Sequence, residues 1–148
     1  MKDRLTIITK WILEFMFWTG IVVTITVPIS FYYYGAYSRH FRENYLALCL
    51  LFMLSGILAI LIIGELRKVF RTVIADDCFI RANVKSLDRM GTYSFLISFI
   101  TVFRLFLYLT PAVLIIVLVF LIAGLFSKVL ARVFDRAVTF KLENDLTI

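Results

Sequence analysis

Four long apolar segments, each close to the length needed to cross a lipid bilayer, dominate this sequence. They lie at about residues 12–34, 45–65, 90–109 and 111–130. A helix needs about 20 mainly apolar residues to span the hydrocarbon core, where every backbone polar group must be bonded within the protein. The sequence therefore predicts an all-α integral membrane protein, a single domain over residues 1–148 with four transmembrane helices packed as a bundle.

The distribution of basic residues predicts the orientation of these segments. Lys and Arg gather before the first segment, between the second and third, and after the fourth. Cytoplasmic loops collect Lys and Arg, so we expect both termini and the central loop in the cytoplasm. The chain is 62% hydrophobic, against roughly 45–50% in soluble domains, so its net charge of +6 indicates topology rather than direct binding of nucleic acid.

The central loop, residues 66–89, has the pattern of helix, turn and helix. Apolar residues recur at intervals of three and four from Leu66 to Ile74, and the opposite face carries Arg67, Lys68 and Arg71. Asp76 and Asp77 are typical turn and capping residues. A second apolar stripe follows at Ile80, Val84, Leu87 and Gly91, with Arg81, Lys85 and Asp88 opposite. Two interpretations stay open: a basic collar attracted to anionic lipid, or a docking platform for a cytoplasmic partner.

The C-terminal tail, residues 131–148, is expected to continue the fourth segment as a helix. Thr110 and Pro111 separate this helix from the third segment, because proline disfavours helix before it and suits a first turn. Val133 and Phe134 continue an apolar stripe that needs cover, and the stripe of the central loop is the obvious partner. The sequence therefore predicts a small cytoplasmic cap, with Glu143 and Asp145 beside its basic faces.

Two charged residues fall inside the apolar segments. Arg104 lies near the expected outer end of the third segment, where it can snorkel or pair with Glu43 and tyrosine hydroxyls. The functional alternative for Arg104 is a gate or a ligand contact. Glu14 lies near the inner edge of the first segment, and we expect Lys10 or Lys128 to be its partner.

Residue patterns typical of catalysis or metal binding do not occur in the sequence. The chain has one histidine, His40, and two cysteines, Cys49 and Cys78, in segments expected in different phases. No Gly-rich phosphate loop or nucleophile elbow is present. We therefore expect a protein that is not an enzyme, with no catalytic residue, no metal and no cofactor.

Several short motifs stand out near the polar segments. The chain has Leu66-Arg67-Lys68, then "FIRANVKSLDRMG", and it ends "KLENDLTI". These motifs resemble those of a bacterial membrane protein family known as domain of unknown function 2975. The matching positions are Phe79, Asn83, Val84, Leu87, Gly91, Phe134, Leu142, Glu143, Asp145, Leu146, Thr147 and Ile148. Cys78, Asp88 and Ala137 depart from the residues usual in that family. The resemblance implies a small four-helix protein of the bacterial plasma membrane, often paired with a helix-turn-helix regulator of the Cro type.

The leading hypothesis is a non-enzymatic regulatory or sensory module that binds such a regulator through its loop and tail. The candidate partner-binding residues are Arg67, Lys68, Arg71, Asn83, Lys85, Glu143, Asp145, Leu146, Thr147 and Ile148. The first alternative is an immunity protein against a membrane-active peptide, with Arg104, His40 and residues 31–34 as the outer contact. The second is a subunit of a small transporter or channel. Besides the lipid bilayer, a second copy of the chain is a further partner that the sequence leaves open.

Overall fold

The described part of the chain consists of helices and short irregular segments, and it contains no strand. The structure is a computed structural model that describes residues 4–37, 43, 45–107 and 110–146. Its helices are α1 (Arg4–Gly35), α3 (Tyr45–Ile74), α4 (Arg81–Leu107) and α5 (Pro111–Leu146). The all-helical fold agrees with the long apolar segments of the sequence.

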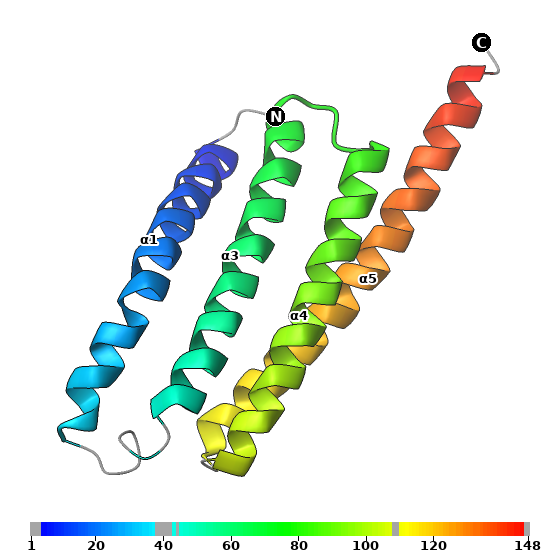
Figure 1. Cartoon of the computed structure of the whole chain (residues 1–148). Helices are drawn as coiled ribbons and strands as arrows, with labels where there is room; N and C mark the ends of the chain where they lie inside the picture. Colours follow the sequence, from blue (N-terminus) through cyan, green and yellow to red (C-terminus); the bar gives the residue numbers. More distant parts are fainter. Residues whose placement is uncertain (1–3, 38–42, 44, 108–109, 147–148) are drawn as a thin grey trace.

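These helices lie side by side in an open row. Figure 1 shows the order α1, α3, α4, α5, with each helix antiparallel to the one before it. In the part of the chain that the structure describes, α1 packs on α3, α3 on α4, and α4 on α5, and no other pair of these helices packs together. The helices thus form no closed four-helix bundle within these residues, and each outer helix has one neighbour.

One end of the row collects most of the charged residues, and we call it the polar end. It holds the start of α1, the turn at residues 75–80 and the C-terminal part of α5 (Figure 1). Ten basic residues of α3, α4 and α5 lie toward this end: Arg67, Lys68, Arg71, Arg81, Lys85, Arg89, Lys128, Arg132, Arg136 and Lys141. The antiparallel order therefore places the central turn and the described ends of the chain together, as the charge pattern predicts.

Three of the described helices are long and apolar enough to cross a membrane. They cover Arg4–Tyr33, Tyr45–Ile74 and Pro111–Leu146. The expected third span, 90–109, overlaps α4, which is not among these three. By length and composition the described helices are therefore compatible with a membrane protein, with three candidate spans.

Two turns between helices, at Thr110 and at residues 75–80, lie where the sequence predicts them. The Thr110 carbonyl accepts a hydrogen bond from the Val113 amide at 3.2 Å, and Pro111 opens α5. At the other turn α3 ends at Ile74, and Asp76 adopts a left-handed backbone with φ 58°. Such a conformation suits a short polar side chain like Asp, so the backbone reverses here.

Helices α4 and α5 cross at two glycines. A Cβ atom on Gly91 would lie 3.1 Å from the Gly124 carbonyl oxygen, and one on Gly124 would lie 2.7 Å from the Phe95 ring. Small residues let helix backbones approach closely in membrane proteins. The two glycines therefore set the spacing of α4 and α5 just below the polar end.

Candidate functional site

The sharpest polar contact joins α1 to α3 at the polar end. Arg67 donates from Nε to Glu14 Oε1 at 2.9 Å and from Nη2 to Glu14 Oε2 at 2.8 Å. Its guanidinium also lies 4.3 Å from the centroid of the Phe17 ring. This two-pronged geometry is the strong form of an arginine–carboxylate pair. The pair fixes the edge helix α1 to α3.

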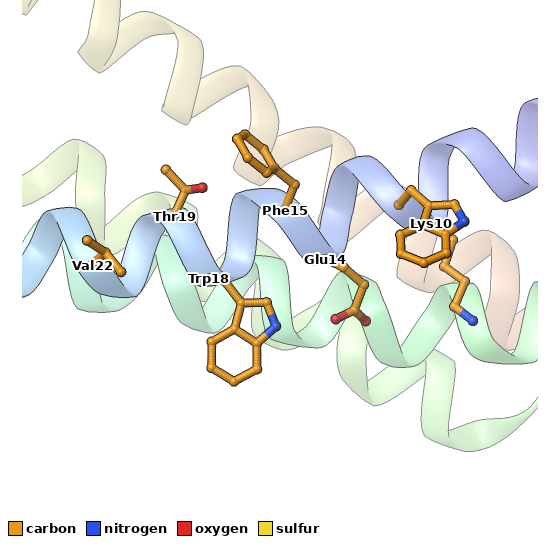
Figure 2. Close-up of a pocket in the computed structure, with 7 residues that line it drawn as sticks. Lys10, Glu14, Phe15, Trp18, Thr19 and Val22 are labelled. Carbon is orange, nitrogen blue, oxygen red and sulfur yellow. The ribbon is translucent and has the colours of Figure 1, made fainter.

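The prediction that Lys10 or Lys128 pairs with Glu14 is wrong. Because α1 and α3 are antiparallel neighbours, Arg67 reaches Glu14 across the helix interface, and Lys128 binds Asp88 and Thr92 instead, each at 2.9 Å. Lys10 and Glu14 both line a groove of about 800 Å³ along α1, together with Trp11, Phe15, Trp18, Thr19 and Val22 (Figure 2). The partner of Glu14 is therefore Arg67 of the neighbouring helix, and neither of the two lysines that were expected.

Asn83 ties the turn to both helices that flank it. Its side chain is 2% exposed, and Nδ2 donates to Thr72 Oγ1 and to the Cys78 carbonyl, both at 2.6 Å. Thr72 Oγ1 in turn donates to the Val69 carbonyl at 2.6 Å. Because the Asn83 amide is buried, it positions the turn rather than offering a contact to a partner.

Ion pairs fasten α5 to α4 and to the turn. Arg81 pairs with Asp135 and also donates to Thr139 Oγ1 at 3.2 Å. Lys141 donates to Asp77 Oδ1 at 2.9 Å, farther along α5. The hydrogen bond from Lys141 to Asp77 and the charge of that carboxylate raise the pKa of Lys141, so its ammonium form is favoured. These pairs hold the extension of α5 to the rest of the polar end.

An apolar core lies under these ion pairs. Leu87, Met90 and Ala131 form a buried cluster, against which Ile62, Leu66 and Phe134 pack. The rings of Phe79 and Phe134 lie 5.2 Å apart, which joins the turn to α5. The predicted packing of the tail stripe on the stripe of the central loop is therefore confirmed at Phe134, whereas Val133, expected in the same stripe, is 51% exposed.

The other candidate residues fall in separate places. Lys68, Arg71 and Lys85 are exposed, on α3 and α4. Glu143, Asp145 and Leu146 are exposed at the far end of α5, where Leu146 is 86% exposed. Thr147 and Ile148 lie outside the described residues. The structure thus offers two surfaces rather than one: the α3–α4 turn region and the end of α5.

Glu65 is a buried charge that sequence reasoning missed. Its side chain is 8% exposed, and Oε1 lies 3.4 Å from Lys68 Nζ and 3.6 Å from Arg89 Nη1. Its Oε2 atom is buried and has no hydrogen-bond partner among the described residues. Its position in the sequence could have indicated a pair. Glu65 directly follows Gly64 at the end of an uncharged run, and Arg89 lies in the first half of the next helix.

Arg104 lies against an aromatic ring near the opposite end of the row. Its guanidinium is 3.9 Å from the centroid of the Phe52 ring, and the Phe52 and Phe31 rings are 4.9 Å apart. A cation over an aromatic face is a favourable arrangement. Pairing with Glu43 stays a prediction, and His40 lies outside the described residues.

The residues that the structure describes include no cluster suited to holding a metal ion. Among the residues that the structure describes, His, Cys, Asp and Glu side chains nowhere gather in threes. Cys49 and Cys78 are free thiols. The polar end presents charged side chains from helices α3, α4 and α5.

Comparisons with known proteins identify the family alone. Neither the curated proteins nor the solved structures include a match to this chain. The family model described as "Protein of unknown function (DUF2975)" matches residues 22–148. This range holds the turn, Asn83 and the whole of α5, whereas Glu14 precedes it. Because the match covers most of the sequence, the chain belongs to the DUF2975 family.

Proposed function

We propose that the chain crosses a bacterial plasma membrane four times, with the polar end in the cytoplasm. The spans are about 12–34, 45–65, 90–109 and 111–130. The span at 90–109, which is not among the three candidate spanning helices, is supported by the position of α4, because α4 packs between two of those helices, α3 and α5. The orientation is supported by the basic residues at the polar end, since Lys and Arg are retained on the cytoplasmic side.

The protein acts there as a non-enzymatic regulatory module that binds a small cytoplasmic DNA-binding protein. One observation carries this proposal: α5 continues as helix to Leu146, and at about 1.5 Å per residue it reaches roughly 24 Å beyond residue 130. Phe140, Leu142 and Leu146 are 73%, 51% and 86% exposed on this extension. At that distance the lipid no longer covers these side chains, so a protein partner is the natural cover.

The chemistry of the extension favours a basic partner. Glu143 and Asp145 lie between the exposed Leu142 and Leu146, so its end combines negative charge with apolar surface. A DNA-binding protein presents a basic surface to phosphate groups, and this surface can also take an acidic helix. The family resemblance points the same way, toward a Cro-type helix-turn-helix regulator. Capture of that surface would keep the regulator at the membrane and away from DNA.

The structure also supports transmission of a movement from the membrane to the C-terminal end of α5. We call this end, which holds Phe140, Leu142 and Leu146, the docking end. Helix α5 is continuous from Pro111 to Leu146, and ion pairs hold it to α4 and to the turn. A shift of the membrane-spanning part of α5 would therefore also move the docking end, because both belong to one continuous helix. The signal that causes such a shift is a change in helix packing inside the bilayer.

Site-specific crosslinking in native membranes tests this function. A photoreactive residue placed at Leu142 should capture a small protein, and mass spectrometry should identify it as a helix-turn-helix protein. The same residue at Tyr37, which is 91% exposed at the other end of the row, should not. The captured protein, once purified, should bind the full chain in competition with its DNA. Capture from both positions, or binding without competition by DNA, would contradict the proposal.

A charge-removing variant gives the matched control. Glu143→Gln with Asp145→Asn keeps the helix and its apolar residues but removes the acidic charge, so capture from Leu142 should fall strongly. Arg4→Gln with Arg136→Gln changes two charges elsewhere at the polar end and should leave capture unchanged. Equal capture by both double variants would mean that charge does not select the partner.

A further inference from the structure

A groove between α4 and α5 opens at the polar end, beside the glycine crossing. Its volume is about 590 Å³, within the range of roughly 300–1,000 Å³ that is usual for ligand sites. Four basic residues, two carboxylates and two apolar residues line it: Lys85, Arg89, Lys128, Arg132, Asp88, Asp135, Val84 and Ala131. Both helices contribute basic residues, so a ligand there would touch α4 and α5 together.

The charges of this groove do not balance. Asp88 is bound by Lys128 at 2.9 Å, and Asp135 pairs with Arg81, which lies outside the lining. Arg89 lies 3.6 Å from the buried Glu65. Lys85 and Arg132 remain, both exposed, and neither forms an ion pair with another described residue. The groove therefore has two cations available for an anionic ligand.

The depth of the groove indicates which anion it would meet. In the proposed topology the spans end near residues 90 and 130, so residues 84–89 and 128–135 lie in the headgroup layer of the inner leaflet. This step rests on the proposed membrane placement, not on the proposed partner. Phosphate groups of anionic lipids are concentrated in that layer, and basic pockets between helices on the cytoplasmic side suit their headgroups.

We infer that this groove binds the phosphate headgroup of an anionic phospholipid. The planar guanidinium of Arg132 matches two phosphate oxygens, and the Lys85 ammonium adds a point charge from the facing helix. Val84 and Ala131 supply an apolar lining. A lipid bound here bridges α4 and α5 where α5 leaves the membrane, and so stabilises the base of the extension.

Lipid titration of the purified full chain tests the inference. Phosphatidylglycerol is added to the protein in neutral detergent, and native mass spectrometry measures the bound fraction. A basic residue that lies close to the bound headgroup contributes about fivefold to anionic lipid binding, so Lys85→Gln with Arg132→Gln should weaken binding by about 25-fold. The matched control, Arg4→Gln with Arg136→Gln, removes the same charge outside the groove and should bind like the parent. Phosphatidylcholine should bind weakly to all of them.

The outcomes separate this inference from the proposed function. Equal loss in both double variants, or no loss in either, would overturn the groove as a site. Displacement of phosphatidylglycerol by inorganic phosphate at comparable concentration would assign the groove to a soluble phosphate and overturn the lipid assignment. Since this measurement contains no regulator, its result does not depend on whether the end of α5 docks a partner.

Discussion

Arg67 of α3 holds both carboxylate oxygens of Glu14 of α1, at 2.9 and 2.8 Å, and its guanidinium lies over the Phe17 ring. Since α1 packs on α3 alone among the described helices, this contact is the main polar link of the edge helix to the row. A charged residue near the membrane boundary is thus neutralised by the neighbouring helix.

Loss of the Arg67 side chain should destabilise the protein. The Arg67→Gln variant leaves the Glu14 carboxylate, whose side chain is 30% exposed, without its cation. We expect a loss of roughly 1–3 kcal/mol, seen as a lower unfolding temperature in detergent. Adding Glu14→Gln should recover part of that loss, because the unpaired charge is then gone. An unfolding temperature equal to that of Lys10→Gln would contradict the importance of this pair.

Loss of the Asn83 amide should loosen the turn. In Asn83→Ala the Thr72 hydroxyl and the Cys78 carbonyl lose the Nδ2 donor, at a cost of roughly 1–3 kcal/mol. Cys78 should then react faster with a water-soluble maleimide, whereas the buried Cys49 should not change. The exposed-site variant Lys85→Gln serves as control. Unchanged labelling of Cys78 in Asn83→Ala would show that the amide does not hold the turn.

A methyl group at Gly91 should force α4 and α5 apart. Its Cβ would lie 2.9 Å from Lys128 Cγ and 3.1 Å from the Gly124 carbonyl oxygen, so the backbone has to move. We expect Gly91→Ala to cost about 1–3 kcal/mol, by unfolding temperature in detergent. Gly64→Ala is the matched control, because there the nearest atom is a Phe17 ring carbon at 3.7 Å. Equal unfolding temperatures for the two variants would count against the close crossing.

Neutralising the carboxylates of the ion pairs that fasten α5 should free its extension. With Asp77→Asn, Asp88→Asn and Asp135→Asn together, amide hydrogen exchange should become faster in residues 131–146 and stay the same in residues 112–127. The pKa of Lys141 is raised, so its contribution is fully present below its ordinary pKa and is lost only as pH rises through the raised value. Exchange measured around neutral pH is therefore insensitive to titration of Lys141. Unchanged protection of residues 131–146 in the triple variant would contradict the fastening.

The sequence predicted what depends on local pattern. Long apolar runs predicted the helices. Thr110 and Pro111 predicted the turn before α5, and Asp76 and Asp77 predicted the turn between α3 and α4. The apolar stripes predicted the contact of Phe134 with the central turn, because each stripe needs cover. The helical extension of α5 as far as Leu146 also followed from its stripe.

Contacts between helices were harder to predict. The pairing of Glu14 with Arg67 joins residues far apart in sequence, so spacing along one helix favoured Lys10. The open row follows from which helix faces pack, and an apolar run alone does not show which of its faces meets a neighbouring helix. Glu65 was missed because a carboxylate at the end of an apolar run looks like a boundary residue, whereas α4 covers it with Arg89.

The most direct test of the proposed docking end compares the full chain with one that stops after Leu142, each crosslinked in its native membrane. The shorter chain keeps Lys141 and its bond to Asp77, so α5 should stay fastened and only the acidic end is removed. We predict that the full chain captures a small helix-turn-helix protein and that the shortened chain, with an unchanged unfolding temperature, does not. Equal capture by both chains would contradict docking through the end of α5.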